Sequence, residues 1–226
     1  MSLLGFLFLF ILVLNLAMAA FGHKMEIGDS DSDAELQKIN NDPKKFQISI
    51  VLALIEHGSI IALTIMLFIV FSPYNLILGV VWTIFRIGEG LIQFYNEKNY
   101  WGLLNIAKRY SGTSGAEKNS LSDLALTIFR TKDSRFKFAM ICWSIGTLAY
   151  SVVFVTYGVV PQIIGWLGIV ASILVGFGNG VQLVVWIREG DVVLVKPNFK
   201  VLAIGGLFAI LFEVILGGWL LFYSTN

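Results

Sequence analysis

Charged residues are scarce in this sequence. Asp, Glu, Lys and Arg make up 14% of its 226 residues, and hydrophobic residues make up 57%. In a soluble domain about a quarter of the residues are charged. The mean hydropathy of this chain, +0.79, is also that of a strongly apolar sequence. This composition excludes an ordinary soluble domain and predicts an integral membrane protein. The formal net charge of +1 gives no reason to expect a nucleic-acid partner.

Cysteine and histidine are scarcer still. The single cysteine, Cys142, excludes an intrachain disulfide and a thiolate metal cluster. The two histidines, His23 and His57, exclude a three-histidine zinc site and leave only carboxylate-rich metal sites conceivable. We therefore expect Cys142 to be a packing residue, and we expect neither a metal nor a cofactor.

Long apolar runs, by contrast, are abundant. A helix needs roughly 20 mostly apolar residues to cross a bilayer. Six windows reach that length, and they fill well over half of the chain: about 3–21, 47–71, 74–95, 137–159, 162–187 and 200–223. The prediction is an all-α, polytopic membrane protein with six transmembrane helices in one membrane domain, residues 1–226, and a longer cytoplasmic connection between the third and fourth helices.

The first window has one alternative interpretation. It ends in Ala17-Met18-Ala19, which resembles the small-x-small pattern of a signal-peptide cleavage site. A secretory signal, however, starts with a positive region and has an apolar run of about 7–15 residues. No lysine or arginine precedes this run, and the run is longer. We favour a retained first helix.

The basic residues predict an orientation. With six spans, every lysine and arginine except Arg86 falls in the three odd connections or at their edges, including Arg188, Lys196 and Lys200 in the last one. The two even connections are the uncharged turns FSPYN and YGVVPQ. The positive-inside rule places the basic face in the cytoplasm. Both termini are then extracytoplasmic, and the protein lies in the cell membrane.

The first connection contains three alternating aspartates, as a calcium loop does. An EF-hand loop that starts at Asp29 requires glycine at its sixth position and glutamate at its twelfth, where this chain has Ala34 and Asn40. We favour a short helix, ELQKIN, opened by a capping box of Ser32 and Glu35 and stopped by Pro43.

The connection between the third and fourth spans is the largest polar piece. The segment YWGLLNIAKRY is expected to lie on the membrane surface with its apolar residues in lipid, and SGTSGAEKNS is expected to be a flexible link. A second helix, LSDLALTIFRTK, then leads into the fourth span. Two interpretations stay open for this basic segment: a docking surface for a cytoplasmic partner, or a solvated edge that faces lipid headgroups.

Five ionisable residues lie at membrane depth. They are Glu56 and His57 in the second span, Arg86 and Glu89 in the third, and Glu213 in the sixth. A charged group at the centre of a span costs about 2.5–3.5 kcal/mol, so these side chains should be sheltered and paired. Reflection across the turn near Pro73 places His57 opposite Glu89. We predict one network of Glu56, Arg86 and Glu89, which Glu213 joins only if the sixth helix packs beside the second and third.

Small residues mark one face of the fifth span. Gly168, Ser172, Gly176 and Gly180 recur at intervals of four, which predicts close packing against another helix. The segment GFGNG could also loosen that helix near Asn179, as in the broken helices of transporters.

The motifs resemble those of a known family. The blocks LALIEHGSIIAL, WTIFRIGEGL, LLNIAKRY and VTYGVVPQIIGWLGIVASIL are similar to successive blocks of a prokaryotic multi-pass membrane family catalogued as domain of unknown function 4386. Its sharpest motifs fall on Arg86 and Glu89, and on Pro161, Trp166 and Gly168. The resemblance implies the membrane architecture and a cluster of Glu56, Arg86 and Glu89. It implies no particular activity.

These observations lead to two functional hypotheses. The first is a non-enzymatic membrane protein, with the bilayer and other membrane subunits as partners, that serves as an accessory, structural or regulatory subunit. The alternative is a small proton- or cation-coupled transporter that uses Glu56, Arg86 and Glu89. An intramembrane enzyme is the weakest hypothesis, because no nucleophile or metal constellation shows the required spacing.

Overall fold

The computed structural model describes residues 1–24, 31–189 and 199–222. These residues form eight α-helices and no strand: α1 (Ser2–Ala20), α2 (Ser32–Asn41), α3 (Pro43–Phe71), α4 (Leu76–Trp101), α5 (Leu103–Ser111), α6 (Gly115–Tyr157), α7 (Gln162–Glu189) and α8 (Phe199–Phe222). Six of them, α1, α3, α4, α6, α7 and α8, are long and apolar enough to cross a membrane. The six predicted spans and the all-α polytopic fold are confirmed.

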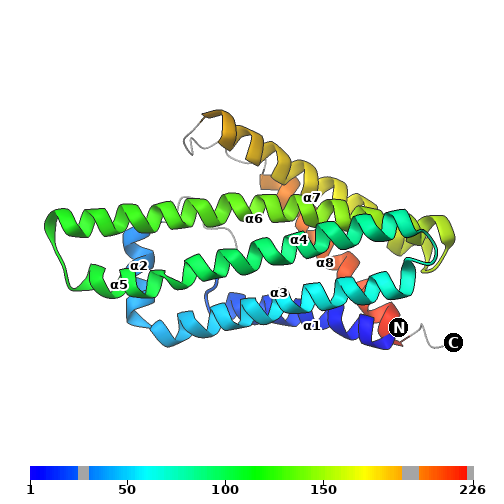
Figure 1. Ribbon diagram of the computed structural model, residues 1–226, viewed down its shortest axis with the longest axis horizontal. Coiled ribbons are helices and arrows are strands. Elements are labelled where there is room, and N and C mark those ends of the chain that lie inside the picture. The colour runs from blue at the N-terminus through cyan, green and yellow to red at the C-terminus, as the bar shows by residue number, and fades with distance from the viewer. Residues whose placement is uncertain (25–30, 190–198, 223–226) are drawn as a thin grey trace.

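The six spans form a closed ring. Contacts join α1 to α3, α3 to α4, α4 to α6, α6 to α7, α7 to α8, and α8 back to α1. The start of α1 and the end of α8 lie at one end of the bundle, together with the turns between α3 and α4 and between α6 and α7 (Figure 1). Helices α2 and α5 and the start of α6 lie at the other end, which we call the basic end.

The predicted boundaries of the third and fourth spans are wrong. Helix α4 continues to Trp101 and α6 starts at Gly115, so the expected connection of residues 96–136 is mostly helical. At about 1.5 Å per residue, the 43 residues of α6 reach roughly twice the thickness of the hydrocarbon core. The predicted helix LSDLALTIFRTK exists, but it is continuous with the fourth span, and only residues 112–114 of the predicted flexible link are not helical.

Packing at the basic end explains these longer helices. Helices α2, α5 and α6 share an apolar cluster that reaches α3 and α4, with Leu36, Ile39, Phe46, Ile50, Tyr100, Leu103, Ala107, Tyr110, Leu121, Ala125 and Phe129 buried in it. The expectation that the apolar residues of α5 lie in lipid is therefore wrong for Leu103, Ala107 and Tyr110, which pack inside the protein. We call this cluster the basic-end layer.

The short helix predicted in the first connection is present as α2. Its N-cap is Asp31, whose side chain accepts hydrogen bonds from the amides of Asp33 and Ala34, so the predicted cap at Ser32 is off by one residue. Helix α3 starts at Pro43, and the Asp42 side chain accepts from the Lys45 amide. Proline suits this first position because its missing N–H would have no partner inside the helix.

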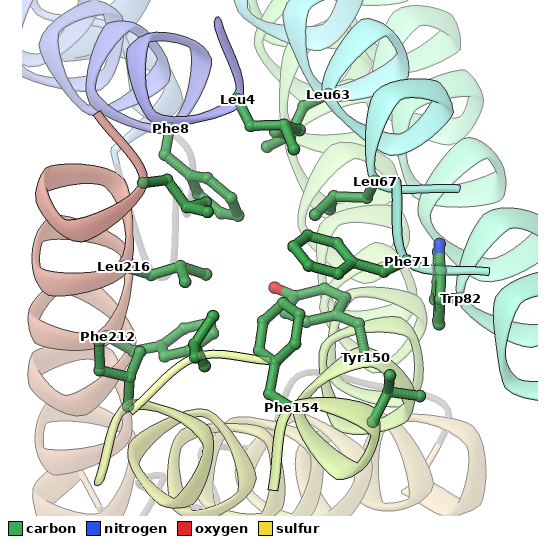
Figure 2. Close-up of a cluster of buried hydrophobic side chains, with 14 of the residues drawn as sticks. Leu4, Phe8, Leu63, Leu67, Phe71, Trp82, Tyr150, Phe154, Phe212 and Leu216 are labelled. Carbon is green, nitrogen blue, oxygen red and sulfur yellow. The ribbon is translucent and has the colours of Figure 1, made fainter. Parts of the chain in front are cut away.

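The half of the ring near the termini is filled by a second apolar cluster. Aromatic and aliphatic side chains from α1, α3, α6 and α8, including Phe8, Phe71, Tyr150 and Phe212, point toward one another (Figure 2). Trp82 of α4 is also fully buried there.

Three of the four predicted packing residues on α7 lie at a helix contact. A Cβ on Gly168 would meet the Phe212 ring at 2.8 Å, and one on Gly176 would meet Ser144 at 2.9 Å, while Ser172 is buried. A Cβ on Gly180 would meet nothing within 4 Å among the residues that the structure describes, so the predicted close packing is not found there. Helix α7 is continuous through GFGNG, and the Asn179 amide donates to the Val175 carbonyl, so the helix is not loosened at Asn179.

Candidate functional site

Polar residues occupy the inner face of α4 along more than three turns. Arg86, Glu89, Gln93 and Asn96 are buried and follow one another at intervals of three or four, and the buried Glu97 lies four residues after Gln93. Residues at these spacings share one face of a helix. Because α4 lies between α3 and α6 in the ring, this face meets polar residues of both neighbours.

The pair nearest the apolar half is Arg86 and Glu89. Arg86 Nη1 donates to Glu89 Oε2 at 2.6 Å, and the two side chains are at most 3% exposed. Gly146 of α6 makes room for the arginine, because a Cβ there would lie 2.6 Å from Arg86 Cγ. A buried charge is tolerated only with a partner, which Glu89 provides.

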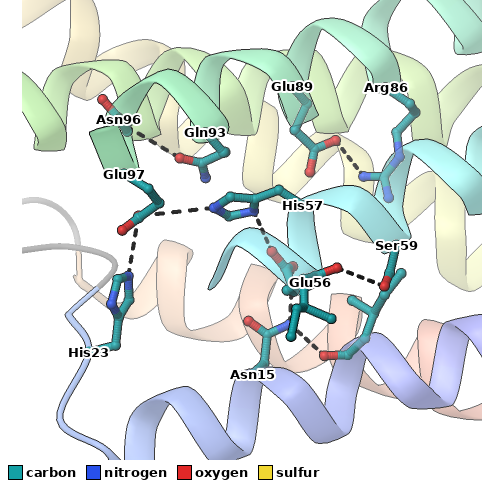
Figure 3. Close-up of polar contacts among 12 residues, drawn as sticks. Asn15, His23, Glu56, His57, Ser59, Arg86, Glu89, Gln93, Asn96 and Glu97 are labelled. Carbon is teal, nitrogen blue, oxygen red and sulfur yellow. Dashed lines mark hydrogen bonds and ion pairs between the residues drawn. The ribbon is translucent and has the colours of Figure 1, made fainter. Parts of the chain in front are cut away.

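A second group lies on α3. The imidazole Nδ1 of His57 lies 2.5 Å from Glu56 Oε2, and the Asn15 amide of α1 donates to the other Glu56 oxygen at 3.5 Å. The other ring nitrogen of His57 lies 4.0 Å from Glu97 Oε1. His57 thus stands between two carboxylates from different helices (Figure 3).

Glu97 is the centre of the group at the basic end. Its Oε1 lies 3.4 Å from His23 Nε2 and 3.3 Å from Lys132 Nζ, in addition to His57. The Glu97, His23 and Lys132 side chains are 2–4% exposed. We call His23, Glu56, His57, Glu97 and Lys132 the histidine cluster. Its members come from α3, α4, α6 and the segment that follows α1.

The histidine cluster touches the basic-end layer through Tyr100. The Lys132 ammonium lies 3.5 Å from the centre of the Tyr100 ring, and the His23 ring packs edge-on against the same tyrosine. Tyr100 also packs on Phe46 and Phe129, at ring-centre distances of 5.0 and 6.3 Å. An ammonium over an aromatic face is attracted by the ring quadrupole, so Lys132 is held by Tyr100 as well as by Glu97.

His23 has two competing arrangements. Lys132 Nζ lies 3.1 Å from His23 Nε2, and Ser49 Oγ lies 3.4 Å from His23 Nδ1. Because an ammonium has only donors, the Lys132 contact requires Nε2 without a proton and places the proton on Nδ1, facing Ser49. A contact from His23 to Glu97 requires a proton on Nε2. The geometry therefore holds a neutral ring next to Lys132 and would hold a protonated ring next to Glu97.

The pKa of His23 favours the neutral ring. Burial lowers this pKa below the ordinary value of 6.5, the neighbouring Glu97 opposes the shift, and the Lys132 charge adds to it. With His23 neutral, the two carboxylates of the histidine cluster face one lysine and the imidazole of His57. A single proton on His57 balances the cluster.

The predicted site residues are only partly brought together. Arg86 and Glu89 are direct partners, whereas the direct partners of Glu56 among the described residues are His57 and Asn15. Helix α8 packs between α7 and α1 rather than beside α3 and α4. Glu213 therefore acts on Arg86 only through its electrostatic field, from across the ring. The expected single network is two groups, with Gln93 and Asn96 between them on the face of α4.

Three central residues were not predicted: His23, Glu97 and Lys132. All three lie in segments that the sequence predicts to be connections between spans, where buried ion-pair partners are not expected. The stripe on α4 was the available signal, because the spacing from Glu89 through Gln93 continues to Glu97 and Tyr100. Within the described residues, no three His, Cys, Asp or Glu side chains are placed to hold a metal ion.

Comparison with known proteins gives one finding. Residues 3–223 match the family described as "Domain of unknown function (DUF4386)". Neither the curated proteins nor the solved structures give a match. The match extends beyond the blocks that carried the resemblance in the sequence and covers all six spans.

Proposed function

The chain belongs to the DUF4386 family, and we propose that it is a non-enzymatic regulatory subunit of a membrane assembly, in which protonation of the buried histidine cluster controls the packing of the basic-end layer. The observation that carries the proposal is the contact of His23 Nε2 with both Lys132 and Glu97, at 3.1 and 3.4 Å. Only one of these two contacts is satisfied in each protonation state of His23.

Protonation changes the forces on Lys132. When Nε2 gains a proton it no longer accepts from the ammonium, and two positive charges then lie about one hydrogen-bond length apart in a buried site. Like charges at that distance repel strongly where water is excluded. The protonated ring is drawn to Glu97, which is also the ion-pair partner of Lys132. The expected result is that Lys132 leaves the face of Tyr100.

Two contacts transmit this change to the basic-end layer. Tyr100 is shared by the histidine cluster and the layer, because it packs on Phe46 of α3 and Phe129 of α6. Lys24 follows His23 in the chain, and its Nζ lies 2.5 Å from Glu35 Oε1 of α2. A shift of the His23 segment therefore acts on α2, and a shift of Lys132 acts on α6. The layer that these helices build is the part that a cytoplasmic partner would contact, given the predicted orientation.

The charged atoms of the histidine cluster point at one another rather than at a substrate, which supports a switching role over catalysis. Protonation of a buried histidine as the pH falls below neutral is a common basis for such switches. The state at neutral pH is the packed layer. The state at lower pH has Lys132 displaced and the layer loosened.

Hydrogen–deuterium exchange on the full chain tests the proposal. At about pH 5.5, compared with about pH 7.5, the protection of α5 and α2 should fall in wild type and stay constant in His23→Gln. Labelling times are scaled for the intrinsic pH dependence of exchange. The apolar cluster around Phe71 serves as the internal control, because its buried residues include no histidine. Equal protection of α2 and α5 at both pH values in wild type would contradict the switch.

A second candidate, a proton-coupled transporter, is favoured by one observation. Polar side chains line the inner face of α4 from Glu97 to Arg86, over about half of the membrane thickness. Toward the termini, this stripe meets the apolar cluster of Trp82, Tyr150 and Phe212. Transport would require that cluster to open. Reconstituted protein should leave a pH gradient intact under the regulatory proposal. Proton flux that appears in wild type and disappears in Glu89→Gln would support the transporter instead.

A further inference from the structure

A cavity with polar and charged residues in its wall lies between α4 and α6 at the basic end. Its volume is about 180 Å³, and Asn96, Asn99, Thr127, Thr131, Lys132 and Arg135 contribute to its wall. A single water molecule needs only about 10–15 Å³ on this measure, so the space is large enough for a polyatomic group. Thr127 is exposed, so the cavity reaches the protein surface on that side.

The wall carries positive charge and no carboxylate. Of the two basic residues, Lys132 directs its ammonium to Glu97 and His23 in the histidine cluster. Arg135 is the cation that remains, and its Nη1 is buried without a hydrogen-bond partner. A guanidinium binds phosphate through paired N–H donors, which makes it the preferred side chain for a phosphate or carboxylate oxygen.

The opposite wall provides an acceptor. Asn96 is 1% exposed, and its amide N–H groups donate to Gln93 Oε1 and to the Lys132 carbonyl, while its Oδ1 is buried without a partner. A buried acceptor without a donor costs about 1–3 kcal/mol, so a ligand that donates to Oδ1 would be favoured. Arg135 on α6 and Asn96 on α4 are thus a cationic donor and a neutral acceptor in the wall, and the Asn96 amide must turn before its buried Oδ1 reaches a ligand in the cavity.

The place of the cavity in the fold matches the depth of lipid headgroups. The Arg135 guanidinium lies 4.7 Å from the centre of the Tyr95 ring, and Tyr95 is 54% exposed. Exposed tyrosines gather at the membrane interface. Toward the membrane, Phe138 follows Arg135 on α6 by one turn and is 49% exposed, as expected of a side chain in lipid.

We propose that this cavity binds a phosphate group with a neighbouring hydroxyl donor, the chemistry of a glycerol phosphate headgroup, with the phosphate on Arg135 and the hydroxyl on Asn96 Oδ1. Two sources carry this chemistry: the headgroup of an anionic phosphatidylglycerol, and a soluble ester such as glycerol 3-phosphate. The two residues proposed to bind the ligand, Arg135 and Asn96, are not members of the histidine cluster, although Lys132 belongs to that cluster and also lines the cavity.

Calorimetric titration of the purified full chain in detergent tests it. Dioctanoyl phosphatidylglycerol should bind, and Arg135→Gln should weaken binding by about 10- to 100-fold through loss of the charged hydrogen bonds. Dioctanoyl phosphatidylcholine, which has no hydroxyl donor and no net charge, should bind weakly to wild type. Arg109→Gln is the matched control, because Arg109 is an exposed arginine at the same end, 3.2 Å from Glu117, and does not line the cavity.

A second variant keeps the test decisive. Thr127→Trp should fill the mouth of the cavity and abolish binding without removing a charge, so it replaces Arg135→Gln if the latter fails to fold. Equal binding of glycerol 3-phosphate and phosphatidylglycerol, both dependent on Arg135, would assign the site to the soluble ester. Tighter binding of the lipid would assign it to the headgroup. Binding of neither ligand, or equal binding by wild type and both variants, would overturn the proposal.

Discussion

Arg86 and Glu89 form a buried ion pair within one turn of α4. Their closest charged atoms are 2.6 Å apart, and neither side chain is more than 3% exposed. The pair lies at the boundary between the apolar cluster near the termini and the polar stripe that continues to Glu97.

Removal of one member of this pair should destabilise the protein strongly. Glu89→Gln leaves a buried arginine without a counter-charge, and the expected loss is about 3–5 kcal/mol of unfolding free energy. The double variant Arg86→Met/Glu89→Gln should lose less than the single variant. Unfolding in mixed micelles of SDS and a mild detergent, followed by circular dichroism, measures both. Glu117→Gln, in the exposed Arg109–Glu117 pair, is the control and should have no measurable effect. A double variant less stable than Glu89→Gln would contradict this role.

An added methyl group should lower the unfolding free energy at one end of the small-residue stripe on α7 and not at the other. In Gly168→Ala the new Cβ would lie 2.8 Å from the Phe212 ring, and overpacking of this kind costs about 1–3 kcal/mol. In Gly180→Ala the Cβ meets nothing within 4 Å, and alanine is the better helix former, so no loss is expected. The same unfolding assay compares them. Equal losses would show that α7 packs along its whole stripe.

Stability should depend on pH through His23. Because burial lowers the pKa of His23 in the folded state, the unfolded chain binds a proton more readily. The stabilisation is therefore complete above about pH 6.5 and declines as the pH falls toward the lower pKa of the folded state, by at most about 1.4 kcal/mol per pH unit. The groups that face His23 are Glu97, Lys132, His57, Ser49 and Tyr100. His23→Gln keeps hydrogen-bonding groups without the titration, so its unfolding free energy should decline less between about pH 7.5 and 5.5. If the unfolding free energy of wild type and of His23→Gln declined equally with falling pH, His23 would be excluded as the source of the pH dependence.

Lys132 should contribute more to the stability of the fold than an exposed lysine at the basic end. Lys132→Met removes the cation that faces Glu97 and Tyr100, and it leaves the Glu97 carboxylate to two histidines. We expect a loss of about 3 kcal/mol or more, and weaker protection of α5 from hydrogen exchange at neutral pH. Lys98→Met, on the exposed side of α4, is the matched control. Unchanged protection of α5 in Lys132→Met would separate the histidine cluster from the basic-end layer.

The sequence was sufficient for features that depend on local composition. Six spans follow from the length and hydropathy of single segments, and the pairing of Arg86 with Glu89 follows from their spacing on one helix. Gly168 and Gly176 were found because close packing requires small residues at regular intervals. Gly180 continues the same interval but lies beyond the reach of the neighbouring helices, which no interval can show.

Features that depend on tertiary contacts were missed. Polar residues after Tyr95 predict the end of a span, yet α4 continues because Tyr100 and the residues of α5 bury their apolar faces against α2 and α6. Because the sequence predicts that the third span ends near Tyr95, it places Glu97 and Lys132 in one solvated connection and His23 in another. Glu56 was assigned to Arg86 by depth, whereas the structure gives it nearer partners in His57 and Asn15. The orientation of the basic end toward the cytoplasm stays a prediction from the positive-inside rule.

The most direct measurement is the protonation state of His23 in the folded chain. The chain has only two histidines, so nitrogen NMR of labelled imidazoles gives two ring systems, and His23→Gln assigns them. We predict that His23 is neutral at pH 7 with its proton on Nδ1, that its pKa lies below 6.5, and that Lys132→Met raises that pKa because the neighbouring positive charge is gone. A His23 ring that is protonated at pH 7, or whose pKa does not respond to Lys132→Met, would contradict the proposed switch.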